Sequence, residues 1–305
     1  MRSHMRLLAA LLALAGPAPA AVAGEAWQAT RIANPTVPAA IVPEVRAKAS
    51  GGLPDGLIAT HAGKGDVAAA WYGQPTRRYG HAILGDGIEA GELKVKLADG
   101  RVVGHRLAQS DVFEDRYPRL ADLDGDGRVE IVTIRSSLSA GGSVAVFGIA
   151  GGSIVLRAAT DYIGRGNRWL NIAGIADFLG DGSKQIAYVE TPHIGGTLFV
   201  YALRRGRLVQ VARKYGFSNH AIGSPEMRLS AVADVNGDGR ADLAVPSANR
   251  KALRIVSIAD GAITELGAAG LPAQIDRAIK WVGEAGRQTF IVGLANGGVY
   301  RVRRP

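Results

Sequence analysis

The chain of 305 residues contains no cysteine, and this absence excludes several classes of protein at once. Disulfide frameworks, thiol catalysis, zinc fingers and iron–sulfur clusters all need cysteine. No P-loop, dinucleotide-binding fingerprint, nucleophile elbow or paired-histidine zinc motif is present either. Aromatic residues make up only 6% of the chain, and none interleaves with a basic run in the manner of a nucleic-acid-binding module. The composition therefore favours a binding protein over an enzyme, and it indicates no specific nucleic-acid partner.

Long apolar runs are also missing after the first residues, which have the order of a secretory signal. Arg2 and Arg6 precede the short apolar run LLAALLALA, and the small residues PAPAAVA follow it. This run is about half the ~20 residues that a membrane-spanning helix needs, so cleavage is expected rather than anchoring. We predict a signal peptide over residues 1–23, a periplasmic or secreted protein, and no membrane span. The formal net charge of +9 could attract an anionic polysaccharide, lipopolysaccharide or nucleic acid, and a solvated basic surface is the favoured alternative.

Glycine, in contrast, is abundant, with 41 residues in the chain. This is about twice the average share of ~7%. Residues 24–56 are rich in alanine, proline and glycine and are interpreted as an N-terminal arm or linker. From residue 57 onward short apolar runs alternate with glycine-containing turns, which predicts many short strands.

The chain contains an internal repeat. Residues 120–134 read LADLDGDGRVEIVTI, residues 175–189 read IADFLGDGSKQIAYV, and residues 232–246 read VADVNGDGRADLAVP. Each segment leads into further strand-like sequence, and four antiparallel strands per repeat are typical of a β-propeller blade. Weaker copies are predicted at 81–95, around the turn Gly85-Asp86-Gly87, and at 279–293, where the last repeat is one strand short. An N-terminal strand would complete that repeat and close the ring. We therefore predict an all-β fold over residues 57–305, a β-propeller of about five four-stranded blades, with four to six possible.

Acidic residues recur at alternate positions within two of these segments. Calcium prefers six to eight oxygen ligands in a flexible loop, and alternate spacing directs side-chain oxygens inward. The calcium ligands predicted for positions 1, 3, 5, 7 and 9, with position 7 contributing its backbone carbonyl, are Asp122, Asp124, Asp126, Arg128 and Glu130 in one segment and Asp234, Asn236, Asp238, Arg240 and Asp242 in the other. The middle segment keeps Asp177, Asp181 and Gln185 but has Leu179 at position 3, so only weak binding is expected there.

These loops do not fit the EF-hand. An EF-hand needs a bidentate glutamate at position 12 and flanking helices. Position 12 is Thr133 in one loop and Val245 in the other, and both lie in strand-like sequence. The loops resemble instead the FG-GAP/VCBS repeats of integrin-α-like propellers. That resemblance implies loops between strands that hold Ca²⁺ in support of the blades, and a ligand that binds on a propeller face.

Three residues stand six positions before the first aspartate of each segment, namely Arg116, Asn171 and Arg228. If each leads into an innermost strand, their side chains would face a central channel that binds a carboxylate or phosphate; pairing with neighbouring loops is the alternative. His220, in the polar segment GFSNHAIGS, is a further candidate, although a hydrogen-bonding role is favoured over catalysis.

The sequence thus supports two main hypotheses and a third, a periplasmic chaperone-like or envelope-maintenance factor that uses its basic surface. In the first, the protein is an exported, monomeric, calcium-binding propeller that acts as a non-enzymatic binding or adhesion scaffold for an unknown protein or an anionic polysaccharide. In the second, it is a secreted carbohydrate-active enzyme, a lyase or hydrolase, with its site at the propeller axis. The second rests on analogy of fold, because no catalytic constellation is present in the sequence.

Overall fold

The computed structural model describes residues 25–33, 46–283 and 288–304, and the predicted signal peptide lies outside them. Within these ranges every regular element is a β-strand, which confirms the predicted all-β fold. No helix in the described part of the chain is long and apolar enough to cross a membrane.

The strands form four hydrogen-bonded sheets, one of nine strands, one of five and two of four. The nine-stranded sheet consists of two units joined by β7 (Asp111–Phe113), and this division gives five antiparallel units, numbered in chain order. Unit 1 contains β3 (Ala59–Thr60), β4 (Val67–Thr76), β5 (Glu89–Leu97) and β6 (Val102–Arg106). Unit 2 contains β8 (Arg119–Ala121), β9 (Glu130–Ser137), β10 (Gly141–Ala150) and β11 (Ser153–Ala159). Unit 3 contains β12 (Leu170–Ala176), β13 (Gln185–Glu190), β14 (Thr197–Arg204) and β15 (Arg207–Tyr215). Unit 4 contains β16 (Ala231–Ala233), β17 (Asp242–Pro246), β18 (Ala252–Ala259) and β19 (Ala262–Gly270). Unit 5 contains β20 (Ile275–Trp281), β21 (Thr289–Leu294), β22 (Val299–Arg303) and β2 (Gln28–Arg31).

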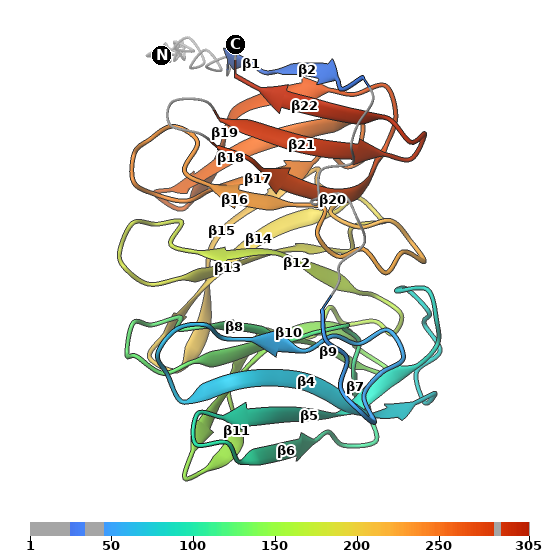
Figure 1. Ribbon diagram of the computed structural model, residues 1–305, viewed down its shortest axis with the longest axis vertical. Coiled ribbons are helices and arrows are strands. Elements are labelled where there is room, and N and C mark those ends of the chain that lie inside the picture. The colour runs from blue at the N-terminus through green and yellow to red at the C-terminus, as the bar shows by residue number, and fades with distance from the viewer. Residues whose placement is uncertain (1–24, 34–45, 284–287, 305) are drawn as a thin grey trace, which may run out of the picture.

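The N-terminal strand predicted to complete the last repeat is β2, which pairs antiparallel with β22. Beside it, β1 (Glu25–Ala26) runs parallel to β19. The expected closed ring is not observed, because units 1 and 5 lie at opposite ends of the molecule (Figure 1). The outer strands of successive units contact one another, β6 with β11, β11 with β15 and β15 with β19. The first strands of several successive units contact one another as well, β3 with β8, β12 with β16 and β16 with β20. The units therefore pack in a row, and β2 completes a sheet and not a ring.

The apolar cores lie between successive units. One core joins β9 of unit 2 to β12 and β13 of unit 3, and another joins units 4 and 5, where Trp27 packs against Phe290. Stacking covers both faces of the middle sheets, and the first eight residues of β10 are all buried. The near-continuous apolar runs of these strands follow from this burial on both sides. Units 1 and 2 are further joined by β7 (Asp111–Phe113), which pairs with both β5 and β9.

The weak repeat copy predicted at 81–95 is wrong. Residues 77–88 form the connection between β4 and β5, and the true first strand of unit 1 is β3. The loop after β3 contains Gly63-Lys64-Gly65, so a lysine stands where units 2, 3 and 4 have the aspartate of Gly-Asp-Gly. The sequence misled because the β4–β5 connection also needs a glycine with positive φ, at Gly85, and therefore resembles the repeat turn.

Candidate metal centre

Three loops join the first strand to the second in units 2, 3 and 4: loop 1 (residues 122–130), loop 2 (177–185) and loop 3 (234–242). Their backbones are held in the same way by the aspartate at position 1. In loop 1, Asp122 Oδ1 accepts the N–H of Gly125 at 2.8 Å and Oδ2 accepts that of Gly127 at 3.0 Å. The aspartates Asp177 and Asp234 accept the equivalent pairs of glycine N–H groups. Both glycines of loop 1 have positive φ, 76° and 81°, which explains why glycine recurs at these positions.

The side chain at position 9 turns back into each loop. Glu130 Oε2 accepts the N–H of Leu123 at 2.8 Å, and Asp242 Oδ2 accepts the N–H of Val235 at 3.0 Å. In loop 2, Gln185 Oε1 accepts the N–H of Phe178 at 2.8 Å. All three side chains belong to fully buried residues. The side chains at positions 1 and 9 thus both accept N–H groups of their own loop.

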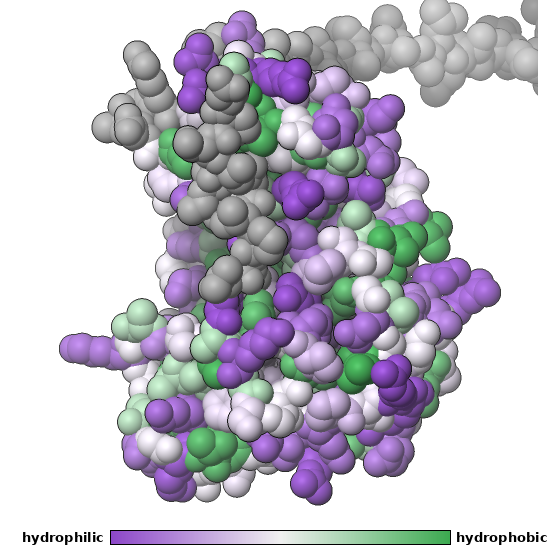
Figure 2. Space-filling model, turned by 45° about the vertical axis from the view of Figure 1, so that its right-hand side comes forward, coloured by the Kyte–Doolittle hydropathy of each residue, from purple (hydrophilic) through white to green (hydrophobic). Residues whose placement is uncertain are grey.

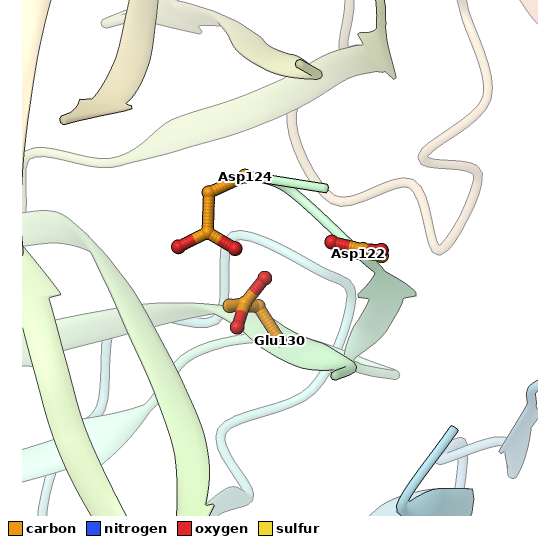
Figure 3. A group of neighbouring side chains, drawn as sticks. All are labelled: Asp122, Asp124 and Glu130. Atoms are coloured by element: carbon orange, nitrogen blue, oxygen red, sulfur yellow. The ribbon is translucent and has the colours of Figure 1, made fainter. Parts of the chain in front are cut away.

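Loop 1 gathers three carboxylates. Oxygens of Asp122, Asp124 and Glu130 all lie within 4.8 Å of one another, and Figure 3 shows the carboxylates of Asp124 and Glu130 facing each other across the loop. This separation suits a central ion with oxygen ligands at ~2.4 Å. Burial raises the pKa of Glu130, although the Leu123 N–H and the Arg157 guanidinium oppose this shift. A cation would stabilise these three carboxylates. The Arg157 guanidinium is such a cation, and it donates to Glu130 Oε1 and, at 3.2 Å, to Asp124 Oδ2.

Loop 3 has an acceptor without a donor. Asp242 Oδ1 is buried and has no partner with hydrogen-bond geometry. Burial raises the pKa of this carboxyl, although the Val235 N–H and the nearby Ser257 hydroxyl oppose the shift. Asp238 is held by Arg240, whose Nη2 lies 2.7 Å from Asp238 Oδ2, and this hydrogen bond lowers the pKa of Asp238. Asn236 donates to the same carboxylate. A buried acceptor without a donor is costly, and a bound cation would satisfy it.

Loop 2 keeps the backbone and lacks the ligands. Leu179 occupies position 3, as the sequence showed, and the amide nitrogen of Gln185 donates to Asp181 Oδ1 at 3.3 Å. A hydrogen bond from the Ser183 hydroxyl lowers the pKa of Asp181. The polar side chains of this loop thus bond to one another, and its weak binding stays a prediction.

The residues present fit calcium at loops 1 and 3, by the gathered carboxylates of one and the orphaned Asp242 oxygen of the other. The side chains of the two position-7 arginines differ. Arg128 reaches Asp66 of unit 1 at 3.4 Å and the carbonyl of Ile149, whereas Arg240 pairs with Asp238 of its own loop. The use of the Arg128 and Arg240 carbonyls, and of Asp126, as ligands stays a prediction.

The loops are also linked to one another. The N–H at position 8 of each loop donates to the preceding unit: Val129 to Asp66 Oδ1 at 3.0 Å, Lys184 to the carbonyl of Leu123 at 2.8 Å, and Ala241 to the carbonyl of Asp177 at 3.0 Å. The loops therefore form a ladder along one edge of the stacked sheets, a relation that no sequence spacing could have shown.

The four candidate channel residues have protein partners. Arg116 forms an ion pair with Asp55 at 2.9 Å, and Arg228 pairs with Glu226 at 2.6 Å. Asn171 is fully buried and donates to the carbonyls of Asn219 and Met227. Of these residues Arg228 lines a cavity of about 380 Å³ beside β8, β12 and β16, which Arg46, Arg119 and Lys184 also line. The described lining includes no acidic residue.

His220 is buried in a histidine cluster that sequence reasoning missed. Its Nε2 lies 2.8 Å from the carbonyl of Ser224, and its Nδ1 lies 3.0 Å from His193 Nε2. Burial lowers the pKa of His220 to about 3 and that of His193 to about 4. Nearby, Glu114 is fully buried and contacts His81 Nδ1 at 2.5 Å. These side chains come from different units, so only the packing of the units brings them together.

Comparison with known proteins agrees with this description. The FG-GAP repeat family matches residues 228–252, which contain all of loop 3. The fold is similar to that of the rhamnogalacturonan lyase YesW, with a TM-score of 0.53 and 18% identity over 85% of this chain. It is also similar to a rhamnogalacturonan lyase of Bacillus licheniformis, with a TM-score of 0.52 and 17% identity over 84% of this chain. The chain spans about half the length of these two proteins, 52% and 51%. A search of curated proteins finds no match.

Proposed function

We propose that this protein is an exported, calcium-stabilised scaffold built from five propeller-type blades, with Ca²⁺ in loops 1 and 3. The single observation that carries the proposal is the ladder of loops, in which each loop donates one N–H to the preceding unit. An ion that fixes a loop would therefore also fix the contact between two sheets. Such a protein presents a rigid surface to a protein or to an anionic polysaccharide.

The character of the surface supports a binding role. Polar residues cover most of the face in Figure 2, and apolar residues form small separate patches between them. Together with the basic composition, this surface favours electrostatic recognition over a large apolar interface.

The experiment is a thermal melt of the full chain in calcium and in chelator. Ligand that binds only the native state at 100 times its Kd adds about 2.7 kcal/mol, which for a protein of this size raises the Tm by roughly 5 °C or more. Elemental analysis of the protein after dialysis against calcium gives the stoichiometry. Equal melting temperatures in both buffers and no bound calcium would refute the proposal.

A second candidate function is that of a secreted carbohydrate-active enzyme. The observation in its favour is the cavity of about 380 Å³ lined by Arg46, Arg119, Lys184 and Arg228, which would attract a carboxylated sugar. The structural similarity to lyases shows a shared fold and is not evidence of shared chemistry. A screen of anionic polysaccharides distinguishes the two functions, because a scaffold retains the polymer unchanged and an enzyme shortens it.

A further inference from the structure

One oxygen of each position-9 side chain accepts a backbone N–H of its own loop. The second polar atom of that side chain has a different environment in each of the three loops. In loop 1, Glu130 Oε1 accepts from the Arg157 guanidinium. In loop 2, the Gln185 amide donates to Asp181 and Ser183. In loop 3, Asp242 Oδ1 has no partner. Loops 1 and 3 both have a complete ligand set. Only in loop 1 does a positively charged side chain contact the carboxylate at position 9.

Arg157 reaches loop 1 because of a β-bulge in the fourth strand of unit 2. The pairing of β10 with β11 shifts register between Val146 and Phe147 and leaves Arg157 as the extra residue. Units 3 and 4 have a bulge at the same place in their fourth strands, and the extra residues there are Val211 and Leu266. A bulge redirects a side chain. The bulge in unit 2 directs a guanidinium toward loop 1, whereas the bulged residues of units 3 and 4 are apolar.

The neighbouring strand makes room for this arginine. A Cβ on Gly148 of β10 would lie 2.7 Å from Arg157 Cδ, so any larger residue would displace the arginine stem. By the same register, Ala202 and Ser257 occupy the position of Gly148 in units 3 and 4. Glycine thus occurs in the one unit that has the arginine.

We infer that Arg157 is a built-in cation that occupies the calcium position of loop 1 in competition with the metal, so that loop 3 binds calcium first. The inference rests on the proposed function, since it concerns the same loops. The guanidinium donates to two of the three gathered carboxylates, Glu130 and Asp124, and calcium can enter only when both are released. Loop 3 has a buried oxygen on its position-9 carboxylate, and calcium would satisfy it without displacing a cation from that carboxylate, because Arg240 pairs with Asp238 at position 5. Loop 1 should therefore bind calcium at least tenfold more weakly than loop 3.

Calorimetric titration of the full chain with calcium, after chelation, tests the inference. The wild type should show one tight site and one site at least tenfold weaker. Arg157→Leu, which copies Leu266, should raise the affinity of the weaker site at least tenfold and leave the tight site unchanged. Gly148→Ala, which copies Ala202 and retains the charge, should act in the same direction by displacing the arginine stem. Arg213→Leu, on the exposed part of β15, is the matched control and should change neither site.

The outcomes separate the two proposals. If the wild type binds no calcium, the proposed function fails. If the wild type binds at two sites of equal affinity, or if neither Arg157→Leu nor Gly148→Ala strengthens the weaker site beyond threefold, the inference about Arg157 fails and calcium binding stands. A thermal melt of each variant in chelator confirms that it is folded. If Arg157→Leu does not fold, the titration of Gly148→Ala alone decides the test.

Discussion

Replacement of Asp242 by asparagine should have opposite effects on stability in chelator and in calcium. In chelator the wild-type carboxylate has a buried Oδ1 without a donor, and such an unsatisfied acceptor costs about 1–3 kcal/mol. Asparagine keeps an oxygen for the Val235 N–H and adds an amide, as Gln185 does in loop 2. We therefore expect Asp242→Asn to raise the free energy of unfolding in chelator by about 1–3 kcal/mol, roughly 3–6 °C in Tm.

In calcium the order should reverse. At 1,000 times the Kd the wild type gains about 4.1 kcal/mol for loop 3, which exceeds the advantage of the variant in chelator, and the variant gains less because it has lost a charged ligand. Calorimetric melts of both proteins in the two buffers test this crossover, with Asp161→Asn, at an exposed position, as the control. A variant that is less stable than the wild type in chelator as well would show that Asp242 has no need of a cation, and the reasoning would be wrong.

Two further predictions concern the fold and its response to pH. Trp27→Ala removes a buried side chain that packs against Phe290, so it should lower the free energy of unfolding by about 3–5 kcal/mol, and proteolysis should then cut near β2; unchanged denaturant midpoints would contradict this. The pKa of His220 is about 3 in the folded protein, below its ordinary value of 6.5, so only the unfolded chain gains a proton as the pH falls from 7 to 5. His220 should therefore account for about 2 kcal/mol of lost stability over that interval, and urea unfolding of His220→Asn at both pH values should show a loss smaller by that amount.

The sequence was informative wherever function depends on neighbours along the chain. Alternate acidic residues and paired glycines gave the positions of loops 1, 2 and 3, because a nine-residue loop has few ways to turn. The period of the repeat predicted the four-stranded units, and a missing last strand predicted the pairing of β2 with β22. The first unit was misplaced because Lys64 replaces the aspartate of its turn, whereas the β4–β5 connection at Gly85 resembles one.

Only the tertiary structure decided what each loop meets. Arg157 is 27 residues from Glu130 along the chain, and a β-bulge, which leaves no reliable mark in the sequence, turns it toward that carboxylate. The contact between His193 and His220, the basic cavity beside three first strands and the ladder between loops likewise depend on how the sheets stack. The local sequence thus determined which oxygens face inward in a loop. The cation that balances their charge comes from a distant strand, and only the packing of the strands places it there.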